Sequence, residues 1–165
     1  MESSELGLDT NMELVLQENK RLIDTLNALL TNEMVAINQY MTHSEMLADW
    51  GYDKFCERVE KRALDEMLHA EKVVKRILLL NGTPELNKLK KINIGSDINR
   101  QLINDHVSGQ ETIAVCDSAI ILANAFNDTT TREILEQILT DEIRHINDIE
   151  ACQNKINQMP LAVYN

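Results

Sequence analysis

The chain has 165 residues, a length that suits one domain with a substantial hydrophobic core. Hydrophobic residues make up 44% of the chain and aromatic residues only 4%, with 5 glycines and 2 prolines. This composition favours packed helices over a β-rich fold. The formal net charge of −11 argues against nucleic acid as the main partner and suits a protein that attracts cations.

The two ends of the chain are expected to lie outside the folded domain. The start of the sequence is polar, and we predict a flexible extension over residues 1–11. The domain is expected over residues 12–160, with a short tail over residues 161–165, because Pro160 should end the last helix. No apolar run is long enough to span a membrane. Three widely spaced cysteines without a C-x-x-C motif favour reduced thiols, so we expect a cytoplasmic protein.

Hydrophobic periodicity predicts four long helices. The first is expected over residues 12–48, followed by a short break at residues 49–53, and the second then runs to about residue 79. The third should follow Ser96 as its N-cap, along a face that we place at Leu102, His106, Gly109, Ile113, Cys116 and Ile120. The fourth should begin at Thr130, the first residue of a capping-box pattern.

The connections between these segments predict the topology. The first and third links are short, so each joins two antiparallel neighbours. The middle link, residues 81–95, is long enough to cross the length of a bundle. The sequence therefore predicts an all-α four-helix bundle with one long crossover.

Two Glu-x-x-His pairs, Glu66–His69 and Glu142–His145, are the most informative motif of the chain. Positions three apart on a helix share a face, so each pair can grip a metal ion from one side. Together with Glu33, all four occupy positions where the helical pattern expects an apolar core residue. Burying such groups without a partner would cost several kcal/mol each. Two metal ions would satisfy them, in the arrangement that di-iron carboxylate proteins use.

The third helix offers no carboxylate at the level of these ligands. Gly109 falls there instead, although glycine inside a helix costs about 1 kcal/mol relative to alanine. Asp105 and His106, one turn earlier, are alternative ligands, whereas Glu111 should face elsewhere. A different interpretation of the cluster is a buried salt-bridge network with Arg62 as counter-ion.

Three stretches of the sequence carry a resemblance to a known family: LNALLTNEMVAINQY, DEMLHAEKVVKRILLLNGTPEL and ILTDEIRHI. In order and spacing, over about residues 20–160, the chain resembles the bacterioferritins of the ferritin-like superfamily. The resemblance implies a ferritin-like bundle. It also implies a fifth helix that is short or absent here, since the chain ends soon after Pro160.

The resemblance places iron ligands at five residues: Glu33, Glu66, His69, Glu142 and His145. It implies that Glu66 and Glu142 bridge the two ions and that Tyr40, beside the site, helps electron transfer. The family's glutamate on the third helix falls at Gly109, so the second metal position is expected to be incomplete. A site with fewer carboxylates should hold Fe(III) less well and oxidise Fe(II) slowly.

The resemblance also implies a haem b ligand at Met67, supplied by each of two subunits across a twofold axis. Met67 follows Glu66 and should point about 100° away from the metal face, towards a partner subunit. An apolar pocket would be completed by Met34, Asn38, Met41 and Leu64. Ordinary hydrophobic dimer packing is the alternative.

The resemblance assigns three residues to the inner surface of a hollow cage. A carboxylate of that surface matches Asp65. A histidine of that surface is replaced by Lys61, with Arg62 beside it, so the surface should attract iron less.

The sequence therefore predicts an iron-storage subunit of a bacterioferritin-like cage, a 24-mer by resemblance. It would take up Fe(II) and act as a weak ferroxidase with O2 or peroxide. A second bacterioferritin subunit and a reducing ferredoxin are the expected protein partners. The alternatives are a haem-binding, electron-transfer or structural subunit of a mixed cage without ferroxidase activity, and a rubrerythrin-type di-metal oxidoreductase.

Overall fold

The computed structural model describes residues 2–88 and 90–158, and the side chains among these from residue 10 onward. It contains four helices, and the described residues form no strand: α1 (Glu2–Asp49), α2 (Asp53–Leu79), α3 (Ile98–Ala125) and α4 (Thr129–Gln158). The helix α1 begins well before the expected start at Met12. Pro160 and the predicted tail over residues 161–165 lie outside the described residues. Within the described part, no helix is long and apolar enough to cross a membrane.

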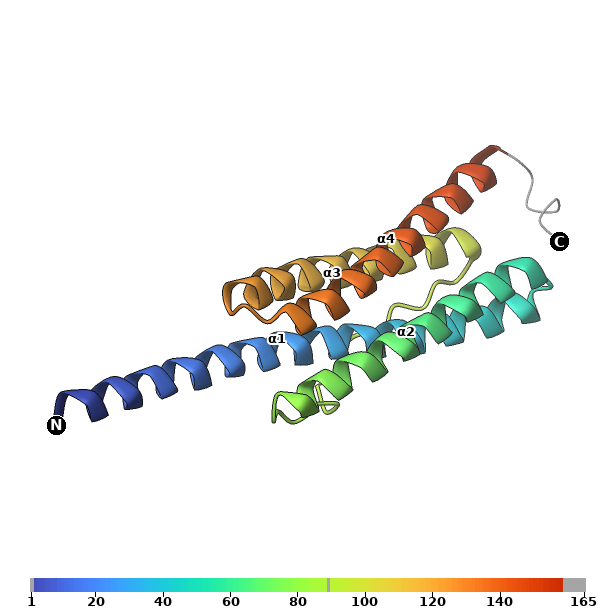
Figure 1. Ribbon diagram of the computed structural model, residues 1–165. Helices are drawn as coiled ribbons and strands as arrows, with labels where there is room; N and C mark the ends of the chain where they lie inside the picture. The colour runs from blue at the N-terminus through green and yellow to red at the C-terminus, as the bar shows by residue number, and fades with distance from the viewer. Residues whose placement is uncertain (1, 89, 159–165) are drawn as a thin grey trace.

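The four helices form two hairpins (Figure 1). A tight turn around Gly51, whose φ is +80°, joins α1 to α2, and a turn around Asn127, whose φ is +54°, joins α3 to α4. Both residues adopt the left-handed backbone conformation that glycine and asparagine accept most readily. Residues 80–88 and 90–97 connect the hairpins without helix, which confirms the predicted four-helix bundle with one long crossover.

The interior contains two apolar clusters. The first is built around Leu26, Leu30, Val73, Ile77, Leu135 and Ile138. The second is built around Tyr40, Leu47, Phe55, Val59, Leu102 and Ile149. Along α1, α2 and α4, buried Glu and His residues lie between the residues of one cluster and those of the other. The core is therefore two apolar halves separated by a polar layer.

Polar side chains of α1 hold the crossover in place. Asn27 donates to the carbonyl of Thr83 at 3.0 Å and accepts from the backbone N–H of Glu85 at 2.8 Å. Further along α1, His43 Nε2 accepts from the N–H of Gly95 at 2.9 Å. A Cβ at Gly95 would lie 2.3 Å from the backbone nitrogen of Gln101, so only glycine lets the crossover come this close to the backbone of α3. The crossover is thus anchored to α1 at both of its ends.

The buried face of α3 differs from the predicted one. Its fully buried residues include Leu102, Gly109 and Cys116, as expected. Between them, however, lie Asp105 and Thr112, while His106, Ile113 and Ile120 are half-buried at the edge. The prediction was wrong by one position at three of its six residues, since Asp105, Thr112 and Ala119 are buried instead. Asp105 can be buried because Gln39 and His43 bind its carboxylate.

Both predicted N-caps in the second hairpin were wrong by one or two residues. The cap of α3 is Asp97, whose side chain accepts from the N–H of Arg100 at 2.9 Å, rather than Ser96. At the start of α4, Asp128 accepts from the N–H of Thr131 at 3.0 Å, in place of the expected cap at Thr130. Asp128 also accepts two hydrogen bonds from Arg76 of α2, each 2.9 Å long. It therefore joins the two hairpins as well as capping a helix.

Replacing Asp128 with alanine should lower the free energy of unfolding by about 1–2 kcal/mol, because it removes a helix cap together with an ion pair. Hydrogen bonds from Thr131 and Arg76 outweigh burial and hold the pKa of Asp128 below its usual value of 3.8. The stabilisation is therefore present above pH 3.8 and is lost as the pH falls through the lower folded-state pKa. Thermal unfolding across this pH range measures the effect.

Thr130→Ala is the matched control, since it changes an exposed residue of the same helical turn. It should leave the melting temperature nearly unchanged. An equal loss in both variants would contradict the assignment of Asp128 as the cap.

Candidate metal centre

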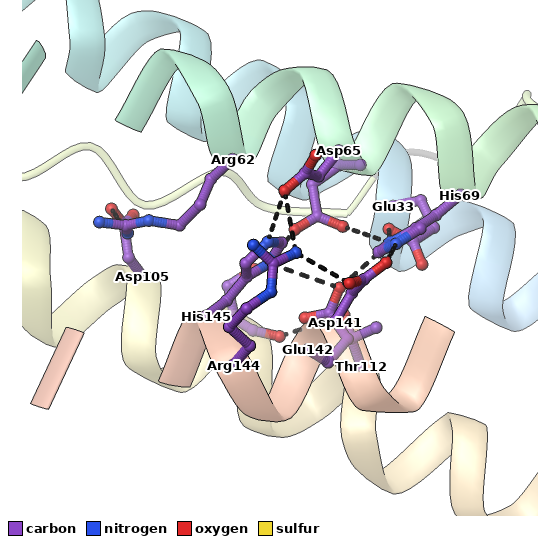
Figure 2. Close-up of polar contacts among 12 residues, drawn as sticks. Glu33, Arg62, Asp65, His69, Asp105, Thr112, Asp141, Glu142, Arg144 and His145 are labelled. Atoms are coloured by element: carbon purple, nitrogen blue, oxygen red, sulfur yellow. Dashed lines mark hydrogen bonds and ion pairs between the residues drawn. The ribbon is translucent and has the colours of Figure 1, made fainter. Parts of the chain in front are cut away.

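The fold brings the five predicted metal ligands into one buried layer (Figure 2). Each of them is at most 1% exposed: Glu33 of α1, Glu66 and His69 of α2, and Glu142 and His145 of α4. Four of them, all except His145, offer ligand atoms that lie within 4.8 Å of one another. This set of three carboxylates and one imidazole could hold a metal ion.

His145 approaches the same carboxylates from the other side. Its Nδ1 lies 3.1 Å from Glu66 Oε1 and 3.9 Å from Glu142 Oε1. His69 Nδ1 lies 3.1 Å from Glu66 Oε2 and 3.4 Å from Glu142 Oε1. The two imidazole rings are 6.3 Å apart between centroids. Glu66 and Glu142 therefore each face both imidazoles, a geometry that suits two ions sharing two carboxylates.

Several polar atoms of this layer lack a hydrogen-bond partner within the described part of the chain. They are both carboxylate oxygens of Glu33, Oε1 of Glu66, Oε1 of Glu142 and Nδ1 of His145. A buried polar group without a partner carries a desolvation penalty of about 1–3 kcal/mol. Unpartnered oxygens and an imidazole nitrogen that face a common space are the donor set of a metal site.

The metal-free cluster shifts the pKa values of its members strongly. Burial raises the pKa of Glu33 well above its usual 4.5, and nearby Glu66 and Glu142 add to the rise. Burial also raises the pKa of Glu142 to about 7. Although burial opposes it, the imidazole of His145 and a hydrogen bond with His69 lower the pKa of Glu66. Contacts with carboxylates raise the pKa of both histidines against the effect of burial. Without metal, the imidazoles therefore hold protons that a bound cation would displace.

A layer of aspartates that the sequence interpretation missed orients the two histidines. His69 Nε2 lies 3.1 Å from Asp141 Oδ2, and His145 Nε2 lies 3.0 Å from Asp65 Oδ2. Arg144 connects the two aspartates, at 2.8 Å from Asp141 and 3.3 Å from Asp65. Such outer contacts fix each ring so that its Nδ1 faces the carboxylates. The signal in the sequence was the repeat Asp-Glu-x-x-His, in which an aspartate precedes each glutamate.

Gly109 lies at the level of the cluster, as predicted. A Cβ built there would be 3.9 Å from Glu142 Oε2. It would also lie 2.8 Å from Cδ1 of Ile146, whose side chain therefore occupies the adjoining space. The other candidate ligands of α3 lie elsewhere: His106 contacts Glu150 at 2.9 Å, and Glu111 is exposed, 3.9 Å from Lys90.

Asp105, the remaining candidate, belongs to a separate buried network. Its Oδ1 accepts from Gln39 at 2.9 Å and lies 2.8 Å from His43 Nδ1. The N–H of Gly95 already donates to His43 Nε2, so Nδ1 carries the proton and donates to Asp105. Arg62 lies 3.8 Å from Asp105 and forms no other ion pair among the described residues. The predicted alternative of Arg62 as counter-ion to the glutamates is therefore wrong, as Figure 2 shows by their separation.

Tyr40 and Met67 occupy contrasting positions. Tyr40 is fully buried beneath the guanidinium of Arg62, whose Cζ is 5.8 Å from the ring centroid. Burial raises the pKa of Tyr40 well above 10, and the charges of Asp105, Glu66 and Glu142 raise it further, so the phenol stays neutral. Met67 is 53% exposed, and Met41 of α1 and Leu64 and Leu68 of α2 are exposed to a similar extent.

The fold and the buried Glu/His layer define a ferritin-like protein, and comparison with known families agrees. The family model of the ferritin-like domain matches residues 23–159. A bacterioferritin of Mycolicibacterium paratuberculosis is 35% identical over 149 residues, covering 90% of this chain and 94% of the relative. A bacterioferritin of Rhodobacter capsulatus is 32% identical over 79% of this chain and 81% of the relative. A bacterial ferritin of Paramagnetospirillum magnetotacticum is 44% identical over 52% of each chain. The chain belongs to the bacterioferritin family.

Glu33→Gln should weaken metal binding at least about tenfold, because it removes one carboxylate and keeps the shape of the side chain. The folded protein holds the Glu33 proton to a higher pH than the unfolded chain does. Deprotonation therefore favours unfolding as the pH rises above 4.5, and the metal-free variant should be at least as stable as the wild type at neutral pH. Metal titration and thermal unfolding of the metal-free protein measure the two effects.

Glu111→Gln is the control for the same change of charge on an exposed side chain. It should bind metal as the wild type does. Unchanged affinity in the Glu33 variant would remove Glu33 from the site.

Proposed function

We propose that this protein is a subunit of an iron-storage cage that binds Fe(II) at an incomplete two-ion site and oxidises it slowly. The observation that carries the proposal is the convergence of buried carboxylate and imidazole atoms, several of which have no hydrogen-bond partner in the described part of the chain. Membership of the bacterioferritin family supports iron as the metal. The carboxylate-rich donor set also suits iron better than a thiolate-loving metal.

Two ligand groups divide the work at this site. Glu33 and His69 would hold one ion together with the shared carboxylates of Glu66 and Glu142. His145 would hold the other ion together with the same shared carboxylates. This ion would have no carboxylate of its own, because α3 has Gly109 at that position. The aspartates behind the two histidines keep each Nδ1 directed at the metals and accept the Nε2–H. The proton on each Nδ1 leaves when a cation binds.

The reaction transfers two electrons from two substrate Fe(II) ions to one O2, which takes up two protons and becomes H2O2. The protein stabilises the Fe(III) product by negative charge near the second ion, and Gly109 removes one such charge. The neutral phenol of Tyr40 lies close enough for Glu66 and Glu142 to raise its pKa, which supports a role in passing electrons. A slow ferroxidase is the consequence.

The proposal places the protein in the cytoplasm, as its three free cysteines favour. It also expects a cage built from many copies, with iron held inside and a reducing ferredoxin for its release. Gly109 specifically favours a mixed cage, in which a second bacterioferritin subunit with a complete site oxidises iron. In that arrangement this subunit would contribute storage surface and haem.

Haem binding is the second part of the proposal. Met67 is half-exposed, so its thioether is available at the surface, and Met41, Leu64 and Leu68 are exposed apolar side chains of the same two helices. Two such surfaces facing across a twofold axis would enclose a flat apolar group, and Met67 of each subunit would hold it through its sulfur. When bound there, haem would provide a one-electron redox centre.

Gly109→Glu should raise the initial rate of Fe(II) oxidation under air severalfold, because it adds the missing carboxylate beside Glu142. Ile146 occupies the space that the new side chain must enter. The variant should therefore be made both alone and with Ile146→Val, which shortens the obstructing end. The rate is measured on the purified oligomer with a few Fe(II) ions per subunit.

Gly109→Gln is the matched control, since it adds nearly the same volume without charge. It should leave the rate at the wild-type level. A wild type that already oxidises Fe(II) rapidly would contradict the incomplete-site proposal, and an equal gain with glutamine would show that charge is not the cause.

Met67→Leu should abolish haem binding and leave the oligomer intact, because leucine keeps the volume but offers no lone pair to iron. Soret absorbance per subunit and oligomer mass are the two measurements. Met12→Leu, at an exposed position near the start of α1, should change neither. Haem retained at wild-type stoichiometry in the Met67 variant would exclude this ligand.

A further inference from the structure

A groove of about 370 Å³ lies between α2 and α4, next to the metal layer, and all of its lining residues come from these two helices. Five cationic side chains line it: Arg58, Lys61, Arg62, Arg144 and Lys155. Only two carboxylates, Asp65 and Asp148, line it with them. The groove is therefore a positively charged site on a chain whose net charge is −11.

Most of this positive charge is not neutralised by the protein. Within the described part of the chain, three of these cations form no ion pair with any carboxylate: Arg58, Lys61 and Lys155. Arg58 donates one hydrogen bond, to the sulfur of Cys152 at 3.5 Å, which leaves its charge uncompensated. Arg144 is held by the aspartates at positions 65 and 141, and Arg62 lies 3.8 Å from Asp105. Cations gathered without counter-charges repel one another, so the arrangement favours a bound anion.

Arg62 supplies an independent observation in the wall of the groove. Its side chain is only 5% exposed, and its Nη1 has no hydrogen-bond partner among the described residues. Asp105 lies 3.8 Å from that nitrogen, too far for a hydrogen bond. Arg62 therefore adds to the wall of the groove a guanidinium whose charge is only partly compensated, and oxyanions match its fork of donors best.

We propose that this groove binds a multiply charged tetrahedral oxyanion of the phosphate class. Guanidinium and ammonium groups from two helices can surround such an ion and hydrogen-bond to its oxygens. The volume admits free phosphate or the phosphoryl group of a small ester, and both present the same chemistry. The groove shares one lining residue, His145, with the buried Glu/His layer, but the anion contacts proposed here are the arginine and lysine side chains.

The test is calorimetric titration of inorganic phosphate into the full-length protein after chelator treatment, since bound iron would itself take up phosphate. The wild type should bind saturably. The double variant Lys61→Gln/Lys155→Gln should bind at least about tenfold more weakly, because two charges that face the anion are gone. Both lysines are exposed, so the fold should not depend on them.

Lys72→Gln is the matched control. It removes the same charge from α2 at a position that does not line the groove. It should bind phosphate as the wild type does. Arg58→Gln is a second groove variant, on another exposed side chain, and should also weaken binding.

A parallel titration with ribose 5-phosphate distinguishes the source of the anion. Binding of either compound that is lost in the groove variants supports the proposal, and the tighter one identifies free phosphate or an ester as the preferred ligand. Failure of both compounds to bind saturably overturns it. Binding that falls equally in the Lys72 variant, or that survives the double substitution, also overturns it.

Discussion

The structure depends on a buried layer of charge. Glu33, Glu66, Glu142 and two histidines occupy the middle of the bundle, where an apolar layer would be more stable without a ligand. Burial of this charge destabilises the metal-free fold. It raises the pKa values of Glu33 and Glu142 and leaves carboxylate oxygens without a hydrogen-bond partner in the described part of the chain. The apolar clusters on either side supply the burial that allows the layer to persist. A bound cation would turn the same groups from a liability into a stabilising contact.

The layer is organised from outside as well as from within. Asp65 and Asp141 each hold the histidine of the opposite motif, so the two Asp-Glu-x-x-His segments of α2 and α4 cross-support each other. Arg144 joins the aspartates and lies at the edge of the cationic groove. Three successive zones therefore lie between the same two helices: the buried Glu/His layer, the orienting aspartates and the groove. A change in the middle zone should affect both of its neighbours.

A second polar network keeps the crossover and α3 in register with the metal layer. Asp105 binds Gln39 and His43 of α1, and His43 in turn binds the backbone of Gly95. These contacts fix the position of α3 along the bundle axis relative to α1. Gly109 therefore lies beside Glu142 rather than one turn away. The absence of a ligand from α3 is therefore a property of the residue at position 109 and not of a displaced helix.

The sequence by itself determined the helix number, the crossover and the buried layer of Glu and His residues, because each depends on local periodicity or on spacing within one helix. Gly109 could also be placed at ligand level by counting turns. The sequence could not determine that Asp128 caps α4, since Asp128 also accepts hydrogen bonds from Arg76 of another helix. Nor could it show that Asp105 faces His43, that Asp141 holds His69, or that cations of α2 and α4 line one groove. Those facts join residues far apart in the chain, so only tertiary packing, which sets distances between helices, decided them.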